Sequence, residues 1–184
     1  MKYRSIVVSG PVASGTSTAA KTLAEKLNLE YHSAGDFFRR YMIDHNIPLP
    51  EKVQVPDAVD RKIDKELTDL AASKKPVIID SLYHGYFTRN IPHVLKVLFK
   101  ADEDVRIERA LLRVHTHKET AEDVKRRDQT HDIKFRKLYA NVYFLDPKFF
   151  DLIIDTTNTP NDKVVQTIAK KFQENIYQPS LKRS

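Results

Sequence analysis

The sequence has no cysteine and no tryptophan, and only four of its 184 residues are glycine. Without cysteine, the chain can form no disulfide and can offer no thiolate to a metal ion, and the absence agrees with a reducing compartment. No apolar run approaches the roughly 20 residues that span a bilayer. A strand-like run follows Met1 and Lys2 directly, without room for a signal peptide. We therefore expect a soluble cytoplasmic protein.

The charge balance of the chain is basic, with 31 lysines and arginines, 25 acidic residues and a net charge of +6. Such a balance predicts an anionic partner, either a nucleotide or a nucleic acid. The sequence contains no aromatic RNP pattern and no GXXG clamp. Its basic runs, at residues 125–127, 135–137 and 182–184, are also typical of solvated helix faces and tails. We therefore expect a nucleotide partner rather than RNA or a membrane.

Short apolar runs rich in β-branched residues alternate along the chain with helical patterns. The runs predict strands at residues 3–9, 29–32, 76–80, 94–99 and 151–155. The helical patterns cover residues 17–27, 34–45, 56–73, 102–114, 120–144 and 161–176. This alternation predicts an α/β fold with a five-stranded parallel sheet that is covered on both faces. We expect one domain over residues 1–177 and a disordered tail at 178–184.

The first predicted strand ends in a glycine-containing stretch that reads GPVASGTST. A strand, two glycines separated by four residues, and then a helix is the layout of a P-loop. Backbone N–H groups of such a loop point inward and bind phosphate oxygens, helped by the dipole of the following helix. The alternative is a turn that only caps the helix. The residues expected to bind ATP are Gly10, Pro11, Val12, Ala13, Ser14, Gly15, Thr16, Ser17 and Thr18.

Thr16 stands where a P-loop has the lysine that reaches the β- and γ-phosphates. A threonine hydroxyl donates one neutral hydrogen bond, worth about 1 kcal/mol, against about 1.5–3 kcal/mol for a charge-assisted bond. The loop should therefore still bind phosphate, with less charge stabilisation during phosphoryl transfer. Lys21 lies further along the same predicted helix, and we expect it to point away from the loop.

The stretch Tyr31–Arg39 reads YHSAGDFFR and resembles the motif Y-x-S-A-G-D-x-F-R of the small cytidylate kinase-like proteins, which belong to the nucleoside monophosphate kinases. The resemblance covers nearly everything from Ile6 to Ile168. It implies a three-layer P-loop NTPase fold, with an acceptor-binding region at about residues 36–73 and a helical lid at about 113–140. It also implies that ATP is the phosphoryl donor.

In that family the serine and arginine of this motif belong to the site of the monophosphate acceptor, so the resemblance implies that Ser33, Asp36 and Arg39 bind it. An ordinary helix cap is the alternative for Ser33 and Asp36. The segment Val59–Asp64 resembles the family's I-D-x-x-I-D and adds Asp60 and Asp64, which share a helix face at i and i+4.

For these two aspartates the alternative is a solvated face on which they pair with Arg61 and Lys65. The resemblance also implies that Arg113, where the lid begins, contacts ATP. The pair Arg127–Asp128 resembles the lid motif whose arginine clamps the phosphoryl group in transfer. Seven residues later, Lys134 replaces the second lid arginine, and we expect it to act on the same group.

Asp80 ends the third predicted strand, where a Walker B carboxylate would hold a Mg²⁺-bound water. We expect Ser17 and Asp80 to hold Mg²⁺; a buried carboxylate paired with a lysine is the alternative. The segment 149–157 resembles the family's last strand, with a structural role. No cluster of histidines and acids suggests another metal site. The scattered histidines are expected at the surface: His84, His115, His117 and His131.

Three positions lose charge or geometry relative to the family pattern. These are Thr16, Lys134 and Leu82. After the aspartate that corresponds to Asp80 the family has Gly-Arg, whereas this chain has Ser81-Leu82. The first hypothesis is a phosphotransferase that moves the ATP γ-phosphoryl group to CMP or dCMP, with Mg²⁺ as cofactor. The second is a nucleotide-binding pseudokinase that regulates without turnover. The third is a basic RNA-associated protein.

Overall fold

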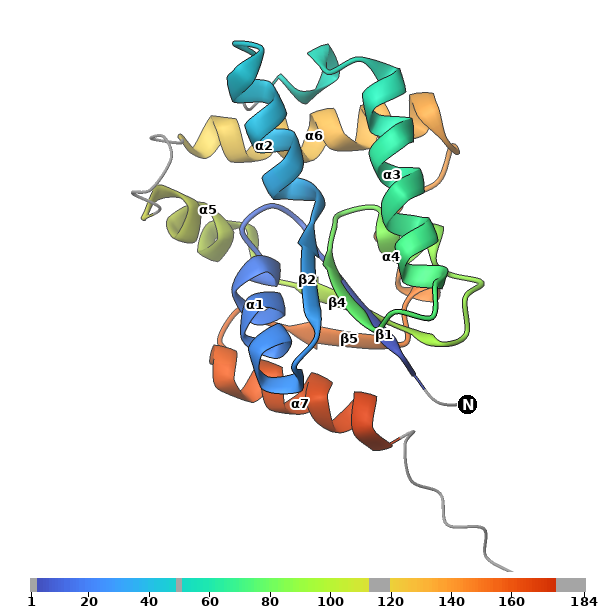
Figure 1. Ribbon diagram of the computed structural model, residues 1–184. Helices are drawn as coiled ribbons and strands as arrows, with labels where there is room; N and C mark the ends of the chain where they lie inside the picture. The colour runs from blue at the N-terminus through green and yellow to red at the C-terminus, as the bar shows by residue number, and fades with distance from the viewer. Residues whose placement is uncertain (1–2, 49–50, 113–119, 175–184) are drawn as a thin grey trace, which may run out of the picture.

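The computed structural model describes residues 3–48, 51–112 and 120–174. Its centre is a five-stranded parallel sheet in the order β2-β3-β1-β4-β5 (Figure 1). The strands are β1 (Ser5–Ser9), β2 (Glu30–Ser33), β3 (Val77–Asp80), β4 (Val94–Lys100) and β5 (Leu152–Asp155). Each prediction of a strand is confirmed, with bounds that differ by one or two residues. The predicted α/β fold is also confirmed.

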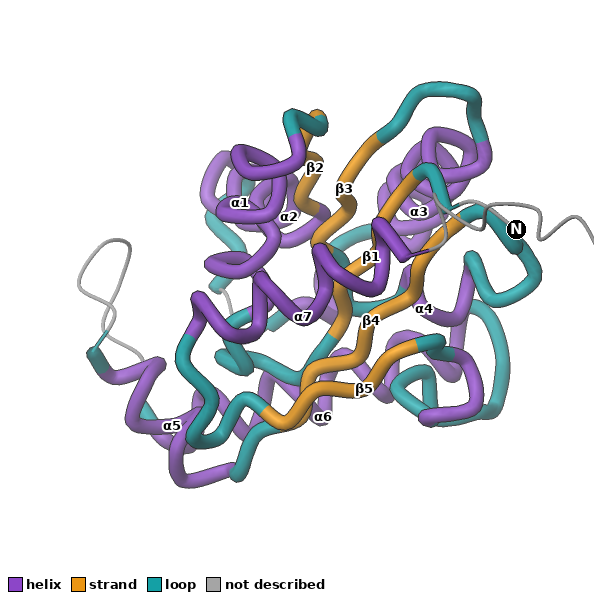
Figure 2. The backbone as a smooth tube through the Cα atoms, turned by 90° about the horizontal axis from the view of Figure 1, so that it is seen from below, coloured by secondary structure: helices purple, strands orange, loops and turns teal. Residues whose placement is uncertain are grey.

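Two helices cover one face of the sheet, α1 (Thr16–Leu27) and α7 (Asn161–Glu174) (Figure 2). Side chains of β1 alternate between the faces, as the pleat of a strand requires. Ile6 and Val8 pack in the core shared with α1 and α7, whereas Val7 faces the core that contains Ala71 of α3 (Asp57–Ala72). The central strand is therefore buried on both sides.

The other helices lie on the opposite face and beyond the carboxyl ends of the strands, where α2, α3 and α6 form the upper part of the molecule in Figure 1. They are α2 (Ala34–Asp44), α3 (Asp57–Ala72), α4 (His84–Phe87), α5 (Glu103–Leu111) and α6 (Ala121–Leu138), with two 3₁₀ turns, η1 (Lys52–Gln54) and η2 (Pro147–Phe149). The short elements α4, η1 and η2 were absent from the sequence prediction, because three or four residues carry no periodic signal.

The long helix predicted for residues 120–144 is wrong at its end, since α6 stops at Leu138. The chain turns there because Phe144 and Leu145 are buried in an aromatic cluster with Phe135 of α6 and Tyr83. The Phe135 ring lies 5.0 Å from that of Phe144 and 5.1 Å from that of Tyr83. Burial of these rings decides where the helix ends, and helical propensity does not.

The prediction of a surface position is wrong for His84, whose side chain is fully buried beside that cluster. Its Nδ1 lies 2.7 Å from the Ser81 hydroxyl and its Nε2 lies 3.1 Å from the Asp64 carbonyl oxygen. Burial lowers the pKa of His84 to about 4. His131 is partly buried against Tyr83, and His115 and His117 lie outside the described residues. In the part of the chain that is described, no helix is both long and apolar enough to cross a bilayer.

Replacing Phe135 by alanine should reduce the free energy of unfolding by about 3–5 kcal/mol, because the change leaves a cavity among fixed rings. Urea denaturation followed by circular dichroism measures this loss. Ile133, two residues earlier on α6 and 59% exposed, provides the control; its alanine variant should change stability by less than about 0.5 kcal/mol. Equal losses in the two variants would contradict the burial of Phe135.

His84 should make stability depend on pH below neutrality. Its pKa is about 4 in the folded chain, whereas an unperturbed histidine has a pKa of 6.5, so the unfolded chain binds the proton first as pH falls. The folded state then loses on the order of 3 kcal/mol between these two pH values. Denaturation of the wild type and of His84→Gln at pH 7, 6, 5 and 4 tests this. The variant should lose less stability over this range, and parallel pH profiles would contradict the prediction.

Candidate active site

The loop Gly10–Thr18 leads from β1 into α1, as a P-loop does. Gly15 takes a left-handed conformation at the helix start, with φ +94°, and Ala13 also has a positive φ of 63°. A Cβ on Gly10 would lie 2.5 Å from the Ser14 hydroxyl and 3.0 Å from Cβ of Phe99, so a side chain at that position would force its neighbours to shift. The Thr156 hydroxyl donates to the Ser14 carbonyl oxygen at 2.8 Å. The curvature of the loop is thus specified by its own residues and by the end of β5.

An ion pair holds the loop from the side of α5 and α6. Asp128 Oδ1 accepts from the Val12 N–H at 3.0 Å, and Arg106 donates to the Val12 carbonyl oxygen at 2.9 Å. Arg106 and Asp128 also bond to each other at 2.7 Å. The backbone N–H and carbonyl oxygen of Val12 are therefore both fixed by one partly buried ion pair. Asp128, which matched the acid of the lid motif, contacts the loop.

Asp80 lies at the mouth of the loop and is almost fully buried. Its Oδ2 accepts from the Ser17 hydroxyl at 2.5 Å and from the Tyr31 hydroxyl at 3.2 Å. Burial raises the pKa of Asp80, and the hydroxyls of Ser17 and Thr16 oppose this rise. The hydrogen-bond partners of Asp80 are thus hydroxyl groups, whereas the alternative interpretation of Asp80 expected a lysine. An adjacent hydroxyl and carboxylate match the oxygen ligands that Mg²⁺ prefers, so these residues fit the ion.

A cavity of about 460 Å³ runs from the loop to the acceptor region. Its loop end is lined by residues 10–13 and 16–18, together with Asp80 and Leu82. Ser14 and Gly15 shape the turn and are not among the residues that line the cavity. The far end is lined by Asp36, Phe38, Arg39, Met42, Lys52, Asp64, Tyr83, Arg127 and His131.

Helix α2 brings the acceptor motif to this cavity. The Ser33 hydroxyl accepts from the Asp36 N–H at 3.0 Å, so Ser33 caps the helix, and it does not line the cavity. Arg39 pairs with Asp36 at 2.8 Å. The expectation that Lys21 points away is wrong, because Lys21 lines the cavity and its Nζ lies 4.0 Å from Asp36. Three charged side chains therefore border the entrance from α1 and α2.

Asp60 and Asp64 share a buried face of α3, so the alternative of a solvated face is wrong for both. Asp60 is fully buried and Asp64 is 3% exposed, and Lys65 pairs instead with Asp69. The Tyr139 hydroxyl donates to Asp64 Oδ2 at 2.6 Å, and Asp64 lines the cavity. Burial raises the pKa of Asp64 to about 7.

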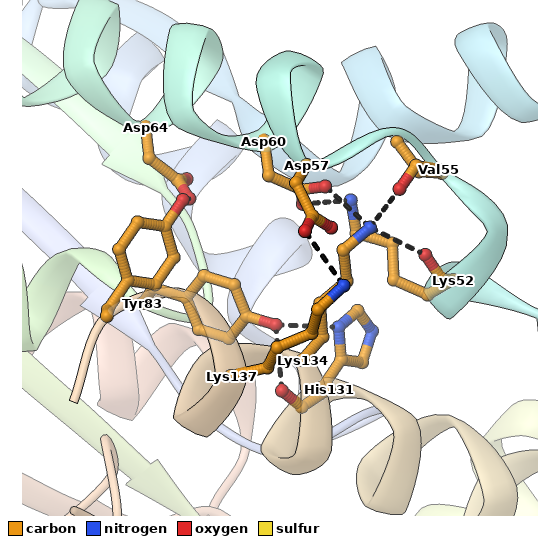
Figure 3. Close-up of polar contacts among 10 residues, drawn as sticks. Lys52, Val55, Asp57, Asp60, Asp64, Tyr83, His131, Lys134 and Lys137 are labelled. Atoms are coloured by element: carbon orange, nitrogen blue, oxygen red, sulfur yellow. Dashed lines mark hydrogen bonds and ion pairs between the residues drawn. The ribbon is translucent and has the colours of Figure 1, made fainter. Parts of the chain in front are cut away.

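The prediction that Lys134 acts on the phosphoryl group is not supported by its position. Lys134 Nζ lies 2.7 Å from Asp60 (Figure 3). Lys134 is 2% exposed and does not line the cavity. Lys52 Nζ bonds the other oxygen of Asp60 at 2.5 Å. A fully buried carboxylate requires paired charges, and this requirement holds Lys134 inside the protein.

Arg127 of α6 does line the cavity, and Leu82 lines it where the family pattern has an arginine. Arg113 lies outside the described residues. The basic run on α6 is largely paired within the chain. Lys125 binds Glu103 at 3.0 Å and Arg126 pairs with Glu51.

Sequence reasoning missed Lys52 and His131 as residues of the cavity. Lys52 follows Pro48 and Pro50 in a stretch without a helical or strand period, so no pattern pointed to it. His131 lies one helical turn after Arg127 on α6, and that i, i+4 spacing is the signal that could have identified it.

Comparison with known proteins gives a consistent result. Residues 35–158 match the model of the cytidylate kinase-like family. A cytidylate kinase of Sulfurisphaera tokodaii is 32% identical over 89% of this chain and 92% of its own length. A cytidylate kinase of Sulfolobus acidocaldarius is 34% identical over 83% of this chain and 85% of its own.

Solved structures share the fold at lower identity. A gluconokinase from Sinorhizobium meliloti has a TM-score of 0.63 at 19% identity, and covers 96% of this chain and 98% of its own. Shikimate kinase from Aquifex aeolicus has a TM-score of 0.56 at 19% identity, and the match covers 94% of this chain and 98% of the shikimate kinase. The P-loop geometry, the acceptor motif beside it and the extent of these matches together identify the chain as a member of the cytidylate kinase-like family.

Proposed function

We propose that this protein transfers the γ-phosphoryl group of ATP to a nucleoside monophosphate, with CMP or dCMP as the acceptor. The observation that carries the proposal is the continuous cavity that joins the P-loop to Asp36 and Arg39 of the acceptor motif. A donor triphosphate and an acceptor phosphate would meet there with their reacting groups in line. Family membership and the names of the archaeal relatives support the same reaction.

In the proposed reaction, an oxygen of the acceptor phosphate attacks the γ-phosphorus, and the bond to the β–γ bridging oxygen breaks. ADP leaves, and the acceptor becomes a diphosphate. The backbone N–H groups of the loop would bind the donor phosphates. Ser17 and Asp80 would hold Mg²⁺, which neutralises phosphate charge when it is bound. Arg39 and Arg127 would orient the acceptor phosphate and the group in transfer.

Cations that line the cavity compensate in part for the charge that Thr16 and Leu82 lack. Lys21 lies at the entrance on α1, and Arg39 and Arg127 line the same cavity. Phosphoryl transfer depends mainly on positioning and on neutralising charge, so cations that reach the phosphates from other elements can support it.

A nucleotide-binding regulator is the second candidate function. The neutral side chains of Thr16 and Leu82 in the cavity favour it, as does the burial of Lys134. Both candidates require that ATP binds the loop. They differ only in turnover.

An assay of ADP release with ATP, Mg²⁺ and each of CMP, dCMP, UMP and AMP should show turnover with CMP or dCMP. Titration calorimetry of ATP, with and without Mg²⁺, runs in parallel. ATP binding without turnover of any acceptor would support the regulator, and absence of binding would refute both candidates.

Arg127→Ala should lower kcat/KM by at least about 100-fold, because it removes a cation from the site where charge develops. Arg126→Ala is the matched control, since Arg126 precedes it on α6, is 60% exposed and pairs with Glu51. The control should retain activity within about threefold, as expected for a surface ion pair. Comparable losses in the two variants would exclude a specific role for Arg127.

A further inference from the structure

The far end of the cavity contains a lysine that is unusual in being both buried and part of the cavity wall. Lys52 is 3% exposed, and it belongs to η1, between α2 and α3. Its Nζ lies 3.1 Å from the centre of the Phe38 ring. Lys52 and Phe38 both line the cavity, so an aromatic face and a cation occur there together.

Contacts on both its side chain and its backbone hold Lys52 in place. Asp60 Oδ1 accepts from its Nζ at 2.5 Å. Lys134 donates to the carbonyl oxygen of Lys52 itself at 3.1 Å and to that of Val55 (Figure 3). Lys134 is thus a positioning residue that fixes the turn, and Asp60 fixes the direction of the ammonium group.

Lys52 and Lys134 share the carboxylate of Asp60, and the charge of Asp64 also acts on Lys52. An ammonium group has three N–H donors. In the contacts of the described residues, Asp60 accepts from one donor of Lys52, and the Phe38 ring faces the group. A donor of Lys52 therefore remains for a hydrogen-bond acceptor on a molecule in the cavity.

The position of Lys52 along the cavity indicates which part of a ligand it meets. Ala34, Phe38 and Met42 line the cavity at i, i+4 and i+8 along α2, which starts at the carboxyl end of β2. At a rise of about 1.5 Å per residue, Phe38 and Met42 lie roughly 6 and 12 Å from the helix start. The Arg39 side chain turns back toward the start of α2, where it pairs with Asp36 in the first turn. Lys52, packed on Phe38, lies beyond that point, and a nucleotide whose phosphate reaches Arg39 would extend its base toward Lys52.

We infer that Lys52 recognises the base of the acceptor nucleotide and donates a hydrogen bond to an unprotonated ring nitrogen of a pyrimidine. This inference rests on the proposed function, because it assumes that the acceptor is a nucleoside monophosphate. The Phe38 ring, whose centre lies 3.1 Å from Nζ, holds the ammonium group from one side. Cytosine carries an unprotonated N3, whereas uracil carries N3–H, which would point a donor at the ammonium group.

Asp64 adds to the same preference. It lines the cavity one turn after Asp60 on α3, and its charge acts on Lys52. A carboxylate beside an ammonium group complements the 4-amino group beside N3 of cytosine, and it disfavours the 4-carbonyl oxygen of uracil. Lys52 and Asp64 together therefore attract cytosine and repel uracil.

The test is calorimetric binding of CMP and UMP, without ATP, to the wild type, Lys52→Met and Lys65→Met. Lys65 is a matched control because it is exposed and pairs with Asp69 on the same helix as Asp60. In Lys52→Met, CMP should bind about 10- to 100-fold more weakly, as for the loss of a charge-assisted bond. The affinity for UMP should change by less than about threefold, so the ratio of the CMP affinity to the UMP affinity should fall about as much as the CMP affinity does. Lys65→Met should keep the wild-type ratio.

A second measurement uses the unaltered protein, in case Lys52→Met does not fold. The 3-deaza analogue of CMP, in which carbon replaces N3, should bind the wild type at least about 10-fold more weakly than CMP does. An analogue that binds as tightly as CMP would overturn the inference. An equal loss of affinity for CMP and for UMP in Lys52→Met would also overturn the inference, because Lys52 would then act on the phosphate or only on the fold.

These outcomes separate this inference from the proposed function. If the ratio of CMP to UMP affinity falls in Lys52→Met as expected, but no ADP is released with any acceptor, the kinase proposal fails and the role of Lys52 stands. If CMP is phosphorylated and the ratio is the same in Lys52→Met, the kinase proposal stands and the role of Lys52 is refuted.

Discussion

The candidate active-site cavity depends on the parallel pairing of β1 with β3, which sets Val8 opposite Asp80. Because parallel strands end at the same edge of a sheet, this register brings the loop after β1 beside the carboxylate at the end of β3. The Ser17–Asp80 hydrogen bond spans the two. A shift of one residue would turn Asp80 to the other face and separate these groups. The hydrophobic pattern of the two strands therefore sets the geometry of the proposed metal site.

A second constraint acts on the acceptor side, where charges are buried and must be paired. Asp60 has no exposed surface and lies between Lys52 and Lys134. The cluster joins η1 and α3 to α6, so one electrostatic contact connects the acceptor region with the long helix that carries Arg127. Lys134, at the position where the family pattern has a lid arginine, thus has a structural role here. The cations of the cavity come from α1, α2, η1 and α6.

Much of the fold followed from the sequence, since apolar strands that alternate with helices admit few other arrangements. The strands and the loop Gly10–Thr18 were predicted because each has a local signal, either a short apolar run or two glycines at a set spacing. The end of α6 was not predicted, because it is set by packing of Phe144 against Phe135 and Tyr83. His84 was expected at the surface for the same reason: single residues carry no sign of burial.

The sequence by itself determined the class of fold, the position of the loop between β1 and α1, and the family. These rest on spacing within short segments, and short-range spacing is visible in one dimension. Only the tertiary structure decided which charged side chains face the cavity. Lys52 and Lys134 are 82 residues apart and meet at Asp60, and their roles depend on which one borders open space. Burial is a property of the packed chain. For this reason, the side chains that line the cavity could be identified only from the tertiary structure.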